Sequence, residues 1–196
     1  MCHRLLRDAR FHRRLFEIDE DLAAQAKARR CSSCQGALHA ASYPRKLRGV
    51  PEGLGADFER RHSFCCGAEN CRKRLTPTSV RFLDRRVYSS VIVVLVAAMA
   101  HGLTSRRIRT LCTELDVDRR TLLRWQEWWR EELPRTDFFA ALRARLDRPL
   151  DGSRLPGSLF DRIQGADDAE RLLCLLGLID PLSHSALMRG RFARAA

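Results

Sequence analysis

The chain has 196 residues, of which 45% are hydrophobic and 31% are charged. That length and apolar content allow one compact domain or two small ones, and they exclude a chain that is disordered throughout. The formal net charge of +12 favours polyanionic partners through phosphate contacts and counterion release. Most of the positive charge is arginine, which a GC-rich genome would also produce, so charge alone does not establish nucleic-acid binding.

The amino-terminal sequence MCHRLLRDARFHRR carries charges throughout and lacks the apolar region of a signal peptide. The longest apolar run, residues 91–100, is far shorter than the roughly 20 residues of a membrane span. We therefore expect a cytoplasmic protein with no membrane partner. In that reducing compartment, the eight cysteines are more typical of metal ligands than of disulfides.

Residues 1–30 are predicted to form an N-terminal helix. Apolar side chains recur at helical spacing among charged ones, from Leu5 through Leu15 to Ala26. The charged positions between them fit a solvated helix face.

Residues 31–84 contain two groups of cysteines and are predicted to form a small β zinc ribbon. The first group is the sequence CSSC, and the second is CCGAENC. Zinc prefers four soft ligands at tetrahedral corners, and each knuckle with two cysteines supplies two of them. The predicted ligands of a structural Zn²⁺ are Cys31, Cys34, Cys66 and Cys71.

Alternative ligands stay open: Cys65 in place of Cys66, or a histidine in place of one of the four cysteines. The four-residue gap between Cys66 and Cys71 closes a tighter knuckle, which favours Cys66 and directs Cys65 to the other strand face. His39 and His62 lie nearby and are alternatives for one ligand. A closed four-thiolate site leaves no position for a substrate water, so the metal is expected to be structural and to stabilise the module.

The rest of residues 31–84 is typical of hairpins and loops, with short alternating segments such as SVRFL at 79–83. Arg72 and Lys73, just after the second cysteine group, are predicted to contact phosphate. Other basic residues lie on the loop between the two groups, where a solvated surface and phosphate contact are both open: Arg45, Lys46 and Arg48.

Residues 86–101 form an apolar segment. Its valines and isoleucine would also suit a strand, but its length, its alanines and Gly102 as a C-terminal stop favour a buried helix.

The segment 86–134 is predicted to contain a helix-turn-helix. Thr104 or Ser105 can cap the first helix of the pair, Asp118 can cap the second, and Pro134 ends it. Cys112 is small and is expected where the two helices cross. The apolar residues expected to face one another across the pair are Leu111, Leu115, Val117, Leu122 and Trp125.

Arginines are left facing outward from the first turns of the second helix. In a helix-turn-helix these turns enter the DNA major groove, where arginine pairs bidentately with guanine. An ordinary helical hairpin has the same apolar spacing, but the short turn and the arginine positions favour DNA binding. Asp116 stands where such turns commonly have glycine, and aspartate tolerates left-handed geometry. The predicted DNA contacts are Arg119, Arg120, Thr121 and Arg124, together with Arg72 and Lys73.

Three tryptophans follow in the second helix. Trp125 and Trp129, one turn apart, are expected to pack inward against the helix at 91–99. Trp128 is expected to face elsewhere, toward a partner or the C-terminal segment.

Residues 135–196 are predicted to form a helical C-terminal region and tail. Short helices are expected at 137–146, 157–163 and 166–178, and a basic tail from about Ser183.

A cysteine ribbon followed directly by a helix-turn-helix resembles the amino-terminal half of insertion-sequence transposases, and the small accessory proteins encoded beside them. The sequences that carry the resemblance are CSSC, SFCCGAENCRKR and LDVDRRTLLRW, within residues 31–133. In that family both elements bind the terminal repeats, and a separate RNase-H-like domain with three metal-binding carboxylates cuts DNA. The residues after Leu133 are too few and too helical for that domain. The acidic residues there that lie on no strand-like run are Asp147, Asp151, Asp161, Asp167 and Asp168.

The resemblance implies a DNA-binding accessory protein or a truncated remnant, without nuclease activity. We expect a mainly α protein with a small β zinc ribbon that binds double-stranded DNA near the nucleoid, for transposase targeting or promoter repression. A transposase or recombinase subunit is the expected protein partner. Two other classes stay open: a protein-interaction adaptor for such an enzyme, and an RNA-binding zinc-ribbon protein. The sequence has neither a glycine-rich loop that would cradle a phosphate nor a nucleophile with a suitable base. Nothing in it therefore suggests an enzyme.

Overall fold

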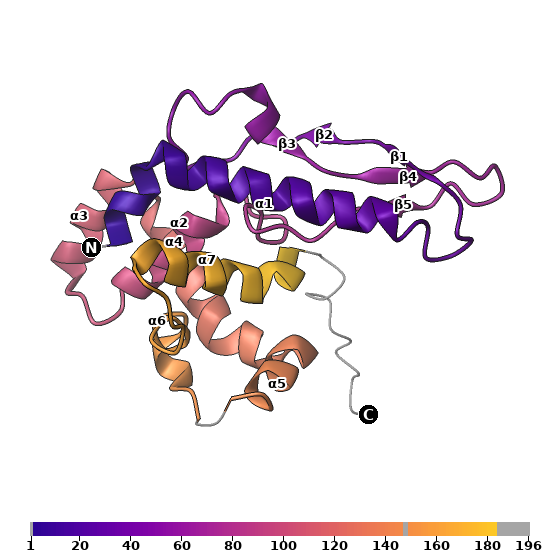
Figure 1. The fold of residues 1–196 in the computed structure, drawn as a ribbon. Helices are drawn as coiled ribbons and strands as arrows, with labels where there is room; N and C mark the ends of the chain where they lie inside the picture. The colour runs from indigo at the N-terminus through magenta and orange to yellow at the C-terminus, as the bar shows by residue number, and fades with distance from the viewer. Residues whose placement is uncertain (1, 147–148, 184–196) are drawn as a thin grey trace.

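The computed structural model describes residues 2–146 and 149–183, and it is mainly helical with two small antiparallel sheets (Figure 1). The basic tail expected from about Ser183 lies outside the described residues, except for Ser183 itself. The α-helices are α1 (Ala9–Ala28), α2 (Ser90–Met99), α3 (Ser105–Glu114), α4 (Arg119–Glu127), α5 (Asp137–Arg143), α6 (Gly157–Phe160) and α7 (Asp168–Ile179). Short 3-10 turns span Cys2–Arg7, Ala56–Glu59, Leu133–Arg135, Gly152–Arg154 and Asp180–Ser183.

Both sheets lie in the cysteine-containing part of the chain. The three-stranded sheet has the order β1-β4-β5, and β2 pairs with β3 in the other. The register places Leu38 opposite Cys66 and Phe64 opposite Leu75. The strands are β1 (Leu38–Ala40), β2 (Tyr43–Pro44), β3 (Arg60–Arg61), β4 (Phe64–Cys66) and β5 (Arg74–Leu75).

Helix α1 confirms the predicted N-terminal helix and connects two parts of the molecule. Asp8 caps it by accepting a hydrogen bond from the backbone N–H of Arg10 at 2.8 Å. With 20 residues it is about 30 Å long, since each residue rises about 1.5 Å. Phe11 and Leu15 face the main core, whereas Ala23 packs against the cysteine module near the other end.

Helix α2 lies at the centre of the main core and confirms the predicted buried helix. Every residue from Ser90 to Ala97 is buried, and α4, α6 and α7 all contact this helix. Ser89 caps it by accepting a hydrogen bond from the N–H of Ile92 at 3.4 Å. Because neighbours cover every face, the segment must satisfy its backbone groups internally, and a helix does so.

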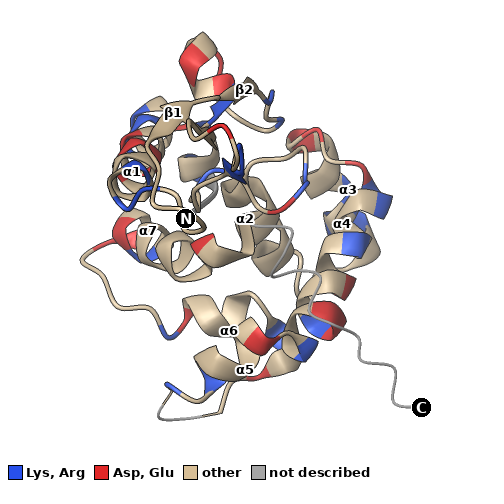
Figure 2. Ribbon diagram, turned by 90° about the vertical axis from the view of Figure 1, so that its right-hand side faces the viewer, with Lys and Arg blue, Asp and Glu red and all other residues tan. Residues whose placement is uncertain are grey.

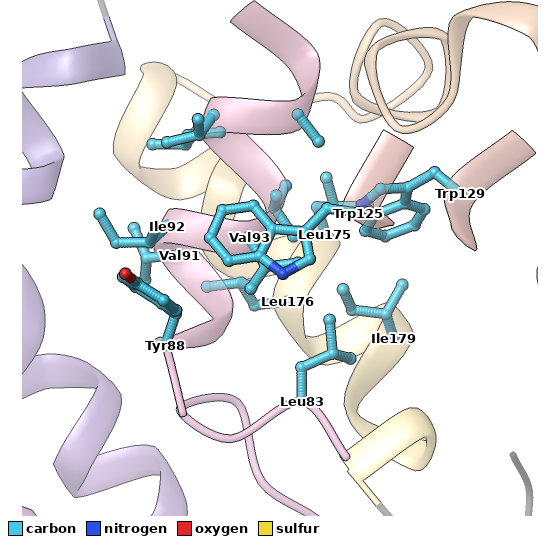
Figure 3. Packing of buried hydrophobic residues seen from close by; sticks show 14 of the residues in the cluster. Leu83, Tyr88, Val91, Ile92, Val93, Trp125, Trp129, Leu175, Leu176 and Ile179 are labelled. Carbon is cyan, nitrogen blue, oxygen red and sulfur yellow. The ribbon is translucent and has the colours of Figure 1, made fainter. Parts of the chain in front are cut away.

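The main core joins residues from Leu6 to Leu182 into one cluster. Figure 3 shows Tyr88 and Trp125 close together beside α2, with Leu176 nearby. The rings of Tyr88 and Trp125 meet edge to face with centroids 5.1 Å apart. Two smaller clusters lie in the cysteine module, one around Cys31, Leu38, Phe64 and Cys66, and one formed by Leu47, Phe58 and Phe82.

Residues 79–83 do not form the alternating strand segment that the sequence predicted. No regular strand is present there, and all five residues are buried. The reason is Asp19 on α1, which lies 2.7 Å from the Nε of Arg81 and also accepts hydrogen bonds from the Ser79 hydroxyl at 2.5 Å and the Val80 N–H at 2.8 Å. Because these polar groups of the segment have hydrogen-bond partners, the whole segment can be buried.

Trp128 is only 4% exposed and belongs to the main core together with residues of the C-terminal region, one of the two directions expected for it. Helix α4 continues as a π-helical turn over Trp128–Glu132, which takes an extra residue per turn. That turn lets two consecutive tryptophans reach the core, and the Trp128 and Trp129 rings lie with centroids 4.8 Å apart. The guanidinium of Arg86 covers Trp128 at 4.2 Å from the ring centroid.

The buried pair of Asp19 and Arg81 gives a test of the fold. We expect Asp19→Asn to lower the free energy of unfolding by about 3–5 kcal/mol, because Arg81 would keep a buried charge without its counter-ion. Urea unfolding followed by circular dichroism measures the change. The matched control is Asp21→Asn on the exposed side of the same helix, which should stay within about 0.5 kcal/mol of the parent. Equal stability of the two variants would contradict the assigned role of the pair.

Candidate functional site

The four cysteines predicted as metal ligands lie together where the cysteine module meets the C-terminal end of α1. The Sγ atoms of Cys31, Cys34, Cys66 and Cys71 all lie within 4.8 Å of one another. Cys31 and Cys71 are separated by 3.6 Å, and Cys34 and Cys66 by 3.4 Å. The seven cysteines from Cys31 to Cys174 are all free of disulfides.

These separations fit a tetrahedral metal site. Four sulfurs at about 2.3 Å from a metal lie roughly 3.8 Å apart along each tetrahedral edge. The cluster can therefore hold a metal ion with four sulfur ligands.

The first knuckle is built by local backbone geometry. The N–H of Gln35 donates to the carbonyl of Cys31 at 2.8 Å, and Gln35 has a φ of 60°, which turns the chain back on itself. Gly36 then passes close to the sulfurs, since a Cβ at that position would lie 3.0 Å from the Sγ of Cys66 and 3.2 Å from that of Cys34. A larger residue at position 36 would crowd the site.

Backbone donors also favour the ligand form of Cys31. The N–H groups of Ser33 and Cys34 donate to its sulfur and lower the pKa of Cys31 to about 6. Donors to the charged form of a group stabilise that form. The thiolate is the form that binds metals.

The alternation of side chains along β4 distinguishes Cys65 from Cys66 as the third member of the cluster. Neighbouring residues of β4 point to opposite faces of the sheet. Cys66 is fully buried and faces the cluster, whereas the Cys65 thiol points away and donates to the carbonyl of Arg72 at 3.5 Å. His39 pairs with Cys65 on that outer face, and neither His39 nor His62 belongs to the cluster.

The choice of ligand can be tested with two neighbouring serine variants. We expect Cys66→Ser to lose stoichiometric metal because three thiolates remain, and Cys65→Ser to keep about one metal ion per chain. Metal analysis by mass spectrometry on protein purified under reducing conditions measures both. We also expect a chelator to unfold the cysteine module, which far-ultraviolet circular dichroism detects. A metal-free parent protein would contradict the metal site itself.

Helices α3 and α4 are joined by the short turn 115–118. The N–H of Val117 donates to the carbonyl of Cys112 at 2.9 Å, and Asp116 has the left-handed φ of 50° that its position suggested. The hydroxyl of Tyr88 donates to the carbonyl of Asp116 at 3.1 Å. The turn is thus fastened to the main core.

Both helices of the pair begin at the caps that the sequence indicated. Thr104 accepts a hydrogen bond from the N–H of Arg107 at 3.4 Å, and Asp118 accepts from the N–H groups of Arg120 and Thr121 at 2.8 and 3.1 Å. The residues predicted to lie between the helices are turned inward. Cys112, Val117, Leu122 and Trp125 are buried, and Leu111 and Leu115 are half-buried.

The outer face of α4 carries the predicted arginines. Arg119, Arg120 and Arg124 are all exposed, and Figure 2 shows basic residues along α3 and α4. Leu123, between them, is 43% exposed. Thr121 is half-buried and accepts a hydrogen bond from Arg124 at 3.5 Å, so it supports an arginine instead of standing free.

The structure does not bring Arg72 and Lys73 next to the arginines of α4. Both residues are exposed beside the cysteine cluster, where Lys73 donates to the hydroxyl of Ser33 at 2.9 Å. The cluster packs near the C-terminal end of α1, whereas Arg7, just before its N-terminal end, donates to the carbonyl of Glu114 on α3 at 3.1 Å. The two sets therefore lie toward opposite ends of a helix about 30 Å long (Figure 1).

Sequence reasoning did not find the buried arginines. Arg61 is 1% exposed, and burial, partly offset by the charge of Asp19, lowers its pKa to about 10. Its guanidinium reaches Ser183 at 3.5 Å, 122 positions along the chain. No local pattern marks such an arginine, because its partners are distant in sequence.

None of the described helices has both the length and the apolar character that crossing a membrane requires. Comparison of the chain with protein-family models, with curated proteins and with solved structures finds no match.

Proposed function

We propose that this protein is a zinc-containing protein that binds double-stranded DNA. The observation that carries the proposal is the outward row of Arg119, Arg120 and Arg124 on the first turns of α4, a helix whose other face is buried. A helix held in this way presents its N-terminal side chains to a DNA groove as a helix-turn-helix does.

The contacts of α4 support a defined docking geometry. Leu122 and Trp125 anchor the helix to the core, and the cap at Asp118 holds its first turn. A helix placed in the major groove would direct the arginines to guanine edges or to phosphates, and the exposed Leu123 to a thymine methyl group. Because the turn is fastened to Tyr88, the arginines are presented on a rigid frame.

Zinc is the metal that we propose for the four-cysteine cluster. Cys31, Cys34, Cys66 and Cys71 would hold it with four thiolates, a set typical of structural zinc sites. When bound, the metal supplies folding free energy to the module, because four sulfurs fill its coordination. An iron ion accepts the same ligands, so the metal analysis described above also decides the element.

The biological setting that we propose is a mobile genetic element. It rests on the order of the two features along the chain, a cysteine module followed directly by the helix pair, together with the basic charge. The DNA would then be an element end or promoter, and a transposase or recombinase subunit the protein partner. The neighbouring open reading frames test this setting, and a catalytic transposase or recombinase beside the gene is the expected finding.

DNA readout is tested by single alanine variants of Arg119, Arg120 and Arg124. Each is expected to cost about 1–3 kcal/mol on a preferred site and to relax its sequence preference, because base contacts are lost. Replacing Arg72 or Lys73 is expected to weaken all duplexes alike and to reduce the salt dependence, because phosphate contacts are lost. Competition binding at fixed salt compares a selected site with random duplexes.

The triple variant of the three α4 arginines gives the decisive result. If it binds both kinds of duplex as well as the parent, α4 does not read DNA and an adaptor role gains support. Preference for single-stranded or structured RNA over duplex DNA in the same competition would instead support RNA binding.

A further inference from the structure

Two segments far apart in the sequence lie side by side next to α4: residues 45–49 of the cysteine module and residues 85–89 before α2. The N–H of Arg48 donates to the carbonyl of Val87 at 2.8 Å, and the N–H of Ser89 donates to the carbonyl of Arg48 at 3.1 Å. These bonds join a loop of the cysteine module to the frame that carries the helix pair.

Side chains of the first segment alternate between the interior and solvent. Leu47 is 3% exposed, whereas Lys46 and Arg48 on either side of it are exposed. Arg45 is held within the structure, because its guanidinium donates to the backbone carbonyls of Asp84 and Arg86 and lies 5.0 Å from the centroid of the Phe82 ring. Of the three basic residues on this loop, Lys46 and Arg48 therefore face solvent.

The second segment alternates in the same way. Tyr88 is buried against Trp125, and Arg86 covers Trp128. Arg85 and Val87 point outward, and Val87 is 55% exposed.

The contacts of Tyr88 and Arg86 place this pair of segments along one side of α4. Tyr88 contacts Trp125 in α4, and Arg86 contacts Trp128 at the start of the π turn. The pKa of Arg86 is lowered by burial and, to a smaller extent, by the charge of Arg124. Arg124 lies one helical turn before Trp128, so it is on the same side of α4 as the paired segments.

The first segment is held rigidly against α2. Gly49 has a φ of 72°, and a Cβ at that position would lie 2.5 Å from the side chain of Ile92. Leu47 fixes the loop from the other side by packing with Phe58 and Phe82. A basic side chain on such a backbone loses less conformational entropy on binding than one on a free loop.

Each of the two elements, the paired segments and α4, carries an exposed apolar side chain. Within the part of the chain that the structure describes, the large hydrophobic side chains with high exposure are Val87, at 55%, and Leu123, at 43%. One belongs to the paired segments and the other to the outer face of α4.

We propose that Lys46, Arg48 and Arg85 form a basic ridge that binds the phosphates flanking the groove occupied by α4. This inference rests on the proposed function and adds a second contact surface to it. A helix in a major groove about 12 Å wide has a phosphate backbone on either side. Elements beside the helix therefore meet phosphates, which fix register and add affinity without selecting sequence.

The test is the double variant Arg48→Ala/Arg85→Ala in the full-length, metal-loaded protein. We expect affinity to fall by a similar factor, on the order of tenfold, for selected and random duplexes, and the slope of log affinity against log salt to drop by about 2. The matched control is Arg143→Ala/Arg145→Ala, which removes the same charge from exposed positions at the C-terminal end of α5, outside every set of proposed DNA contacts. The control should keep the parent slope, and metal content and melting temperature should be unchanged in both variants.

Three outcomes would overturn the ridge. If the double variant keeps the slope of log affinity against log salt of the parent protein, these residues do not contact phosphate, even if the α4 variants lose binding as expected. An equal loss in the Arg143/Arg145 control means that net charge and not a local contact is responsible. Failure of the parent protein to bind duplex DNA at any salt concentration removes the proposed function and the ridge with it, and the parent titration alone identifies that case.

Discussion

A buried carboxylate on α1, that of Asp19, holds together parts of the chain that lie about sixty positions apart. It accepts the guanidinium of Arg81 at 2.7 Å and also binds Ser79 and Val80. Arg81 in turn donates to backbone carbonyls at Phe58 and Arg60. A charge removed from water costs several kcal/mol unless it is paired and hydrogen-bonded, so these partners must assemble together. The cysteine module, α1 and the approach to α2 thereby take one arrangement.

That arrangement sets the distance between the two chemical features of the molecule. The four-cysteine cluster and the helix pair lie toward opposite ends of α1, and the segment 79–83 runs through the interior between them. A metal bound at the cluster would therefore act on the proposed DNA binding through the fold. It would order β1 and β4, which belong to the same module as β2, β3 and the loop at 45–49. In the proposed DNA complex this loop carries part of the basic ridge.

Features governed by neighbours in sequence were predicted well. The ligand choice of Cys66 over Cys65 follows from the strand alternation and from the spacing to Cys71, both local properties. The caps at Thr104 and Asp118 and the left-handed Asp116 depend on residues within three positions of one another. The short turn and the inward apolar residues follow from the helical period. For the candidate site, the amino-acid sequence was therefore sufficient to locate the four clustered cysteines and the exposed arginines of α4.

Burial of polar groups was decided by the tertiary structure. Arg81 and Arg61 look like solvated arginines in the sequence. Arg81 is paired with Asp19, 62 positions away, and Arg61 donates to the carbonyl of Pro77, 16 positions away, and to Ser183, 122 positions away. Trp128 reaches the core because α4 continues as a π turn, which the spacing of apolar residues in the sequence does not predict. The pairing of Arg48 with Val87 likewise depends on two loops that meet over α2. This pairing determines which basic residues of the loops are exposed and which are held within the structure. Local chemistry in the sequence determined the ligands, the caps and the helices, whereas only the folded chain decided which charges remain at the surface.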